Sequence, residues 1–176
     1  TEEILALLDN TPHKATFFLI GQRAEQMPET VRKIVAAGHV IANHTFTHST
    51  GLGFMSTDKV EQEILRCDAA LSGISGKIPL FYRPPFGVTN PSIARALGRT
   101  GHKVMGWTIR SLDTKIQDPA KIFDRITARL APGKVVLLHD TSPRSVEVVK
   151  RLLPELDRRN LRSITLEELH DEVAYR

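Results

Sequence analysis

The sequence predicts an α/β fold built on parallel strands. Short apolar runs alternate with segments of helical periodicity along the whole chain, and no linker, repeat or low-complexity stretch interrupts the series. Runs of this length and composition are typical of strands that are buried on both faces of a sheet. The candidate strands are residues 15–20, 40–43, 80–83, 103–109, 135–139 and 162–165.

The segments between these runs carry the start and stop residues of helices. A proline at the first helical position opens them, in most cases behind a capping side chain, and a glycine closes them. The pairs are Pro28 with Gly38, Asn90-Pro91 with Gly101, and Asp118-Pro119 with Gly133, while Ser142-Pro143 opens the last long helix. The chain itself opens on a helical pattern, with Ile4, Leu7 and Leu8 on one face.

Composition excludes several classes of protein. With 176 residues and 41% hydrophobic content, the chain is large enough to bury a core as one domain. The net charge of +4 is spread over segments of mixed sign, which predicts solvated helix faces and no nucleic-acid groove. No apolar run approaches the ~20 residues that span a bilayer, and no targeting signal is visible. The single cysteine, Cys67, lies on an apolar helical stripe and is predicted to be a buried small hydrophobe.

Two histidines directly behind a predicted strand indicate a metal site. His44 and His48 follow the apolar run 40–42, and imidazole is the commonest protein ligand of Zn²⁺. A catalytic zinc site uses three protein ligands and leaves one position for water or substrate, so two of the three are visible here. Taken alone, the spacing is equally compatible with two polar loop histidines.

Further polar residues follow the later strands. They are the segment 83–87, Asp113 and His139-Asp140. In a barrel of parallel strands, active sites are built at the carboxyl ends of the strands, so these residues are predicted to face one edge together with the two histidines. Each alone has a simpler explanation, as a surface cation, a turn residue or a helix cap, but their joint placement favours a catalytic edge.

These residues resemble the polysaccharide deacetylase family, also called the NodB homology domain. The similarity extends over nearly the whole chain, in matching order and spacing. The matching motifs are the histidine motif 44–48, the arginine-proline-proline motif 83–87, Ser111-Leu112-Asp113, the leucine-histidine motif 137–140 and the strand 15–21. The resemblance implies a distorted (β/α) barrel, a hydrolase that removes acetyl groups from N-acetylated carbohydrate such as chitin or peptidoglycan, and an extracellular or cell-envelope location.

The resemblance also assigns roles at the site. His44 and His48 would hold a divalent metal, with zinc expected and cobalt, nickel or manganese as alternatives. Arg83 would orient the catalytic carboxylate, and the backbone N–H of Phe86 would bind the oxyanion. His139 would act as the general acid, with its protonated form favoured by Asp113. Leu137 and Trp107 are candidate walls for the acetyl methyl group, although core packing explains both equally well.

One family motif does not occur in the sequence. The Thr-Phe-Asp-Asp-Gly stretch of the first strand, which supplies the third metal ligand and the catalytic base, has no counterpart in residues 1–176. We therefore expect a single NodB-like domain over 1–176 that is incomplete at its N-terminus and lacks the first strand. A natural form without catalysis is the alternative.

Two smaller departures affect the substrate. Thr114 stands where many relatives carry tryptophan, and Arg110 stands where they often carry an acidic residue. The expected partner is a glycan or amino sugar, with no nucleic acid, and the oligomeric state stays open. Two other functions remain: an acetyl esterase or cyclic-amide hydrolase on the same scaffold, and a non-catalytic glycan-binding domain.

Overall fold

The structure, a computed structural model, describes all residues 1–176 and contains two compact units. The four-stranded unit comprises Ala15–Met105 and Thr165–Arg176, and the two-stranded unit comprises Thr1–Lys14 and Gly106–Ile164. Each has its own parallel strands and its own apolar core. No helix of the chain is both long enough and apolar enough to cross a membrane.

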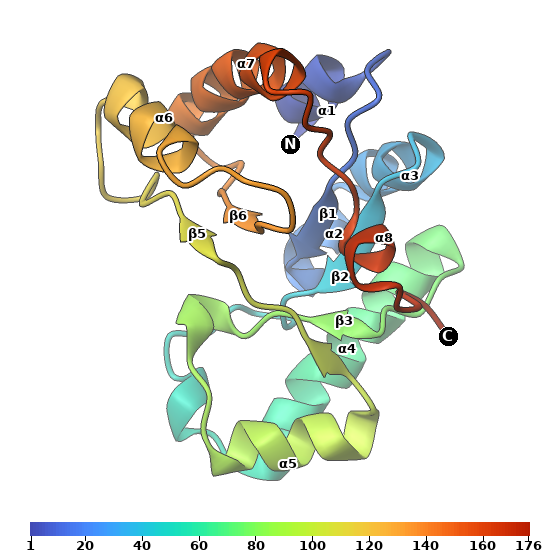
Figure 1. Ribbon diagram of the computed structural model, residues 1–176. Coiled ribbons are helices and arrows are strands. Elements are labelled where there is room, and N and C mark those ends of the chain that lie inside the picture. The colour runs from blue at the N-terminus through green and yellow to red at the C-terminus, as the bar shows by residue number, and fades with distance from the viewer. The chain divides into compact units, whose positions relative to one another are not determined.

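The four-stranded unit is built on a parallel sheet in the order β1-β2-β3-β4 (Figure 1). The strands are β1 (Thr16–Leu19), β2 (Val40–Asn43), β3 (Phe81–Tyr82) and β4 (Lys103–Val104). β1 and β2 pair over their full length, with Thr16 opposite Val40 and Leu19 opposite Asn43. All four residues of β2 are buried, as expected for a strand covered on both faces.

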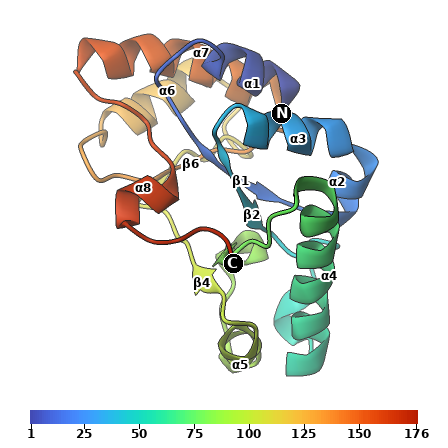
Figure 2. The same cartoon turned by 90° about the vertical axis from the view of Figure 1, so that its right-hand side faces the viewer.

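Helices cover this sheet. They are α2 (Gly21–Gln26), α3 (Pro28–Ala36), α4 (Thr57–Ser75), α5 (Pro91–Thr100) and α8 (Leu166–His170), with two short 3₁₀ turns, η1 (Leu52–Phe54) and η2 (Pro85–Gly87). Figure 2 shows α4 with α2 beside one end and α5 beside the other, and both helices pack against it. The core beneath α4 and α5 consists of Leu52, Val60, Ile64, Tyr82, Ile93, Ala96 and Leu97.

The two-stranded unit pairs β5 (Ile109–Arg110) with β6 (Val136–Leu137) in parallel. Three helices, α1 (Glu2–Leu8), α6 (Pro119–Thr127) and α7 (Pro143–Arg158), lie together in both views, and α7 packs against the other two (Figures 1 and 2). The fully buried core is formed by Ile109, Ile122, Ile126, Val148, Leu152 and Leu156. The helix expected at the start of the chain is therefore present as α1.

Most of the predicted helix signals are confirmed. Asn90 caps α5 by accepting a hydrogen bond from the N–H of Ile93, and Gly101 ends that helix at a φ of 71°. This left-handed conformation is accessible to glycine without a steric penalty. The sequence predicts that the helix beginning at Pro119 ends near Gly133. This end is wrong, because α6 stops at Thr127. The carbonyl of Thr127 accepts a hydrogen bond from Arg159 Nη1.

The predicted strand 103–109 is wrong as one element, because it is two strands in two sheets. The N–H of Met105 donates to the carbonyl of Tyr82 in the four-stranded unit, whereas those of Thr108 and Ile109 both donate to the carbonyl of Val135 in the two-stranded unit. Gly106 lies at this change of backbone partner. An apolar run does not reveal such a change, because both strands are equally hydrophobic.

The predicted strand 162–165 is also wrong, because residues 161–165 belong to no strand and pair with no sheet. The N–H of Ser163 donates to His13 Nδ1, and the carbonyl of Ser163 accepts a hydrogen bond from the N–H of Lys14. Thr165 caps α8 with its side chain. Ser163 therefore makes individual backbone hydrogen bonds to the segment 13–14 instead of pairing along a strand.

Cys67 is buried as predicted. Its thiol lies on α4 and donates to the carbonyl of Leu19 at 3.4 Å. Burial raises the pKa of the Cys67 thiol to about 12, so the reactive thiolate does not form at neutral pH.

Candidate active site

The loop behind β2 carries both predicted histidines and has an unusual backbone. Thr45 and His48 adopt left-handed φ values of 65° and 54°, which are uncommon for residues other than glycine. Three hydrogen bonds hold the loop in this conformation. Asn43 Oδ1 accepts from the N–H of Thr45 at 2.9 Å, Thr45 Oγ1 accepts from the N–H of His48 at 3.1 Å, and the carbonyl of Thr45 accepts from the N–H of Gly21 at 3.0 Å.

The loop brings the two imidazole rings together. Their centroids lie 4.8 Å apart, with the ring planes at 61°. His44 Nδ1 lies 2.6 Å from the carbonyl oxygen of Arg83. Because a carbonyl only accepts, Nδ1 carries a proton, and in the neutral ring Nε2 is then the nitrogen with the lone pair. A histidine ligand oriented through its second nitrogen in this manner is typical of metal sites.

The two histidines therefore fit two positions of a metal-binding group. No cluster of three or more His, Cys, Asp or Glu side chains that would hold a metal occurs in residues 1–176. A catalytic zinc needs three protein ligands, so the pair has the chemistry of a partial ligand set. The role of His44 and His48 as ligands stays a prediction.

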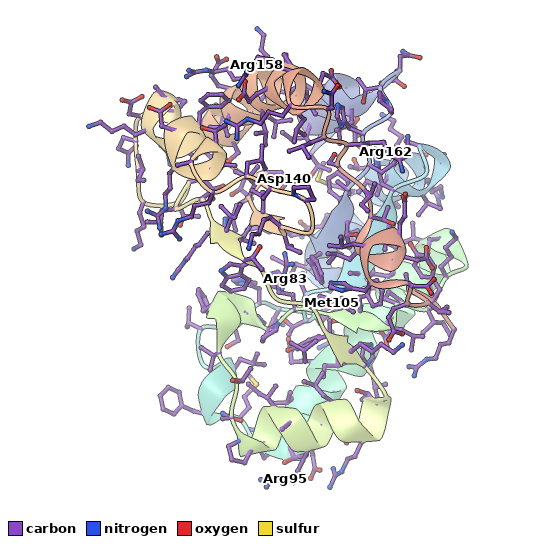
Figure 3. The ribbon with its side chains drawn as sticks, viewed as in Figure 1. Arg83, Arg95, Met105, Asp140, Arg158 and Arg162 are labelled. Atoms are coloured by element: carbon purple, nitrogen blue, oxygen red, sulfur yellow. The ribbon has the colours of Figure 1, made fainter.

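Arg83 is buried beside this loop. Its Nε donates to the carbonyl of Met105 at 2.9 Å, and its guanidinium lies 3.8 Å over the ring of Phe18 (Figure 3 shows Arg83 and Met105 together). Burial lowers the pKa of Arg83 to about 10, so the side chain is still a cation at neutral pH. Arg83 thus combines a fixed position with a charge able to hold a carboxylate.

Phe86, in the short turn η2, is the other predicted residue on this side. Its φ of 58° is left-handed, and its side chain is 60% exposed. The ring packs edge-on against that of His48, with centroids 4.9 Å apart. The turn therefore presents the Phe86 backbone next to the histidine loop. The oxyanion role of its N–H stays a prediction.

Two residues of α4 that were not predicted also hold the histidine loop. Glu63 Oε2 accepts hydrogen bonds from both the backbone N–H and the hydroxyl of Thr47, each at 2.8 Å. The guanidinium of Arg66 lies 3.9 Å over the ring of Phe46. Their spacing of three residues places them on one helix face. That spacing is the only sequence signal, and it does not identify the loop as their partner.

A second polar group lies in the two-stranded unit, where Asp113 and His139 are hydrogen-bonded. His139 Nδ1 lies 2.9 Å from Asp113 Oδ1, and the N–H of His139 donates to Asp113 Oδ2 at 2.6 Å. Asp113 is 1% exposed, whereas the His139 ring is partly exposed. The buried carboxylate thus fixes a histidine that still reaches solvent, which is the arrangement a proton donor requires.

Asp113 is an anion throughout the physiological pH range. Burial by itself raises the pKa of this carboxyl, but the hydrogen bonds from His139 and from the hydroxyl of Ser145 more than offset it and lower the pKa to about 2. A third neighbour, Ser111, donates to Oδ1 at 2.9 Å. The carboxylate therefore accepts four hydrogen bonds, two from His139 and one from each serine.

Ser145 was missed by the sequence reasoning. It lies in the first turn of α7, is buried, and donates its hydroxyl to Asp113 Oδ2 at 2.9 Å. A serine in the first turn of a helix is ordinary, so the sequence alone does not distinguish it from a capping residue. Ser111, by contrast, belongs to the motif that contains Asp113.

The two residues predicted to line the space for the acetyl methyl group lie in different surroundings. Leu137 ends β6, is buried, and pairs in register with Arg110 of β5. Trp107 lies in the irregular segment between β4 and β5 and is partly buried, so the expectation that it belongs to a strand is wrong. The switch of backbone partners near Gly106 explains this. Neither position tests the proposed contact with an acetyl group.

The predicted residues thus form two groups. His44, His48, Arg83 and Phe86 lie in the four-stranded unit, and Asp113, Leu137, His139 and Trp107 lie in the two-stranded unit. Within each group, the polar members are in direct contact or share a hydrogen-bond partner. Within each unit, the spacing along the sequence therefore identified residues that lie together, whereas the placement of both groups along one common edge stays a prediction.

Comparison with known proteins identifies the family. The family model described as polysaccharide deacetylase matches residues 1–105. This chain belongs to the polysaccharide deacetylase family. A peptidoglycan-N-acetylglucosamine deacetylase of Bacillus cereus is 31% identical over 170 residues, and a chitooligosaccharide deacetylase of Bradyrhizobium is 29% identical over 185 residues. Enzymes of this family are generally metal-dependent.

The extent of these matches differs between the relatives. The first match covers 94% of this chain but 62% of the Bacillus cereus protein, and the second covers 97% of this chain and 84% of the Bradyrhizobium protein. The structure of the peptidoglycan deacetylase PdaC from Bacillus subtilis superposes with a TM-score of 0.91 at 25% identity, over 97% of this chain and 82% of that one. The predicted fold class, an α/β fold of parallel strands of the distorted (β/α) barrel type, is confirmed.

Proposed function

We propose that this polysaccharide deacetylase is a metal-dependent hydrolase that removes acetyl groups from an N-acetylated glycan. The observation that carries the proposal is the histidine pair, in which the two rings lie 4.8 Å apart and the Arg83 carbonyl orients the ring of His44 through Nδ1. The Asp113–His139 pair adds a fixed proton donor. We further propose that residues 1–176 act as one NodB-like domain of an extracellular or cell-envelope protein.

His44 and His48 would hold the metal, for which zinc is the first choice and cobalt, nickel and manganese are the alternatives. When bound, such an ion lowers the pKa of water and polarises a carbonyl oxygen. The third ligand and the catalytic base are expected from the Asp-Asp pair of the family's first motif, which does not occur in residues 1–176. His44 and His48, by the closeness of their rings, fit the two remaining places.

Arg83 and Phe86 would act on the groups around the scissile amide. The Arg83 cation, held by Met105 and stacked on Phe18, would keep the catalytic carboxylate in one orientation. The backbone N–H of Phe86, on a turn fixed by its left-handed φ, would donate to the developing oxyanion. Both groups are positioned before the substrate arrives, which is what electrostatic catalysis requires.

His139 would deliver a proton to the leaving nitrogen. Its Nδ1 is engaged by Asp113 Oδ1, so Nε2 is the nitrogen that can donate. An amine is a poor leaving group unless it is protonated, and the ionised Asp113 would hold the imidazole in the orientation in which it supplies this proton. Leu137 and Trp107 would limit the space for the acetyl methyl group.

Release of acetate from N-acetylated glycans tests the proposal. The protein is incubated with chitin oligomers and with peptidoglycan, and acetate and free amine are measured after removal of metal by a chelator and again after addition of Zn²⁺. We expect equal amounts of acetate and amine, loss of both on chelation, and recovery with zinc. Release from acetyl esters but from no amide would support an esterase instead, and glycan binding without either release would support a binding domain.

A further inference from the structure

The carboxylate of Asp113 has a symmetrical set of hydrogen bonds. Oδ1 accepts from Ser111 Oγ and from His139 Nδ1, each at 2.9 Å. Oδ2 accepts from the N–H of His139 at 2.6 Å and from Ser145 Oγ at 2.9 Å. Each oxygen therefore takes one hydrogen bond from the histidine and one from a serine, and rotation of the carboxylate breaks bonds at both oxygens.

Ser145 donates its only hydroxyl proton to this carboxylate. A serine hydroxyl has one proton to donate, and a serine in a helix commonly gives it to a carbonyl of the preceding turn. Ser145 is 1% exposed and directs its proton out of α7 to Asp113 Oδ2 instead. The hydroxyl thus connects the start of α7 with the Asp113–His139 pair.

We infer that Ser145 is a positioning residue for His139, which it orients through Asp113. The inference rests on the proposed role of His139 as the general acid. With Ser145 in place, hydrogen bonds hold both oxygens of Asp113 in position, and the bond from Nδ1 to Oδ1 fixes the plane of the imidazole. Without it, Oδ2 keeps a single donor, the carboxylate gains freedom to rotate, and the direction of the proton on Nε2 is no longer set.

Other charges around Asp113 do not replace this hydroxyl. On α7, Arg144 Nη2 points to the backbone carbonyl of Asp113 at 3.5 Å, and Arg144 Nη1 donates to Gln117. Lys115 is exposed two residues beyond Asp113, and Asp140 follows His139 in the chain. The side-chain oxygens of Asp113 therefore depend on His139 and the two serines.

Substitution of Ser145 tests the inference in the intact protein. We expect Ser145→Ala to lower kcat for amide deacetylation roughly tenfold, the order expected for one hydrogen bond to a charged group, with little change in KM. Ser145→Thr keeps the hydroxyl and should restore most of the rate. The hydrogen bond from Ser145 lowers the pKa of Asp113, so this pKa rises in the alanine variant. The acidic limb of the pH–rate profile of Ser145→Ala should therefore move to higher pH.

Ser142→Ala is the matched control. Ser142 caps the same helix by accepting from the N–H of Arg144 but makes no bond to Asp113. Loss of the Ser142 hydroxyl weakens the N-terminal cap of α7 but removes no hydrogen bond from the carboxylate of Asp113. We expect this variant to keep the pH–rate profile of the parent. If Ser142→Ala reproduces the kinetic change of Ser145→Ala, the serine acts only on helix stability and the inference is overturned.

A spectroscopic readout separates this inference from the proposed activity. In ¹⁵N-labelled protein, the proton on His139 Nδ1 should give a downfield resonance that weakens or exchanges faster in Ser145→Ala and returns in Ser145→Thr. This signal does not require turnover. If the parent releases no acetate while the signal follows Ser145, the proposed function fails and the positioning contact stands. An unchanged signal and rate in Ser145→Ala overturn the inference.

Discussion

At the scale of single residues, hydrogen bonds decide what each candidate side chain can do. The ring nitrogens of His44 and His139 are both assigned by an oxygen acceptor at Nδ1, a carbonyl for His44 and a carboxylate for His139. In both rings the acceptor fixes the orientation of the imidazole and places Nε2 on the opposite side of the ring. The same type of contact thus orients two histidines to which different roles are proposed.

His139→Ala tests the acid at this scale. Removal of a general acid slows the step that it serves by roughly 10²–10⁴-fold, so we expect an amide deacetylation rate lower by that factor. Cleavage of an acetyl ester should suffer less, because an alcoholate leaves more easily than an amine. Metal content and the circular dichroism spectrum are the controls and should not change. Full amide activity in the variant would exclude His139 as the proton donor.

The lowered pKa of Asp113 predicts a dependence of stability on pH. A carboxyl whose pKa falls from 3.8 to about 2 on folding stabilises the chain fully above pH 4, and this contribution is lost as the pH falls toward 2. The shift corresponds to about 2 kcal/mol. We expect the free energy of unfolding, measured in urea between pH 5 and pH 2, to fall less steeply in Asp113→Asn than in the parent. Parallel curves would contradict the assignment.

At the scale of elements, α4 supports the histidine loop from outside. Glu63 holds Thr47 by two hydrogen bonds of 2.8 Å, while Asn43 holds the start of the loop. The loop contains two left-handed residues, whose strain persists only where the surroundings enforce it. The helix and the strand together therefore maintain the geometry of the two imidazoles.

Glu63→Ala should weaken metal binding. Glu63 holds Thr47, which lies between the two proposed ligands and is not a ligand itself. We therefore expect the affinity for Zn²⁺ in isothermal titration to fall by roughly tenfold, the lower end of the 10–100-fold range for loss of a ligand's own hydrogen-bond partner. Glu61→Ala is the matched control, because Glu61 lies on the same helix and pairs with Arg99 instead. Equal affinities of the two variants would show that α4 does not support the loop.

At the scale of the whole chain, each unit joins segments that are far apart in sequence. In the four-stranded unit, the buried Asp68 of α4 accepts a hydrogen bond from Asn43 at 2.8 Å and lies 3.2 Å from His102 Nε2 and 3.4 Å from Arg176 Nη2. In the two-stranded unit, His13 lies 3.2 Å from Asp157 of α7. These pairs differ in burial, because Asp68 is 7% exposed at its side chain and Asp157 is 66% exposed.

This difference predicts unequal effects on stability. Asp68→Ala leaves buried polar partners without their acceptor, and breaking such a pair typically costs about 3–5 kcal/mol in the free energy of unfolding. Asp157→Ala removes a partner of the buried His13, but because Asp157 is itself exposed, water replaces it, and the loss should be about 0.5–1.5 kcal/mol. Chemical denaturation of both variants measures the two values. A loss for Asp68→Ala no larger than that for Asp157→Ala would mean that the cluster does not stabilise the fold.

The sequence by itself determined the fold class and the residues of both polar groups. Alternating apolar runs require parallel strands buried by helices, and the polar residues follow these strands because a buried strand offers no other place for them. The same reasoning failed for residues 103–109 and 162–165. Hydrophobicity does not record which strand a segment pairs with, and it did not predict that both residues of β4 are exposed.

Only the tertiary structure decided which groups form hydrogen bonds with one another. Sequence spacing placed His44 near His48 but did not reveal that the Arg83 carbonyl, 39 residues away, assigns the proton of His44. It likewise left Ser145 as an ordinary serine in the first turn of a helix, although its hydroxyl lies on a carboxylate 32 residues earlier in the chain. Hydrogen bonds are directional and act over about 3 Å, so contacts between distant segments are settled by the packing of the folded chain.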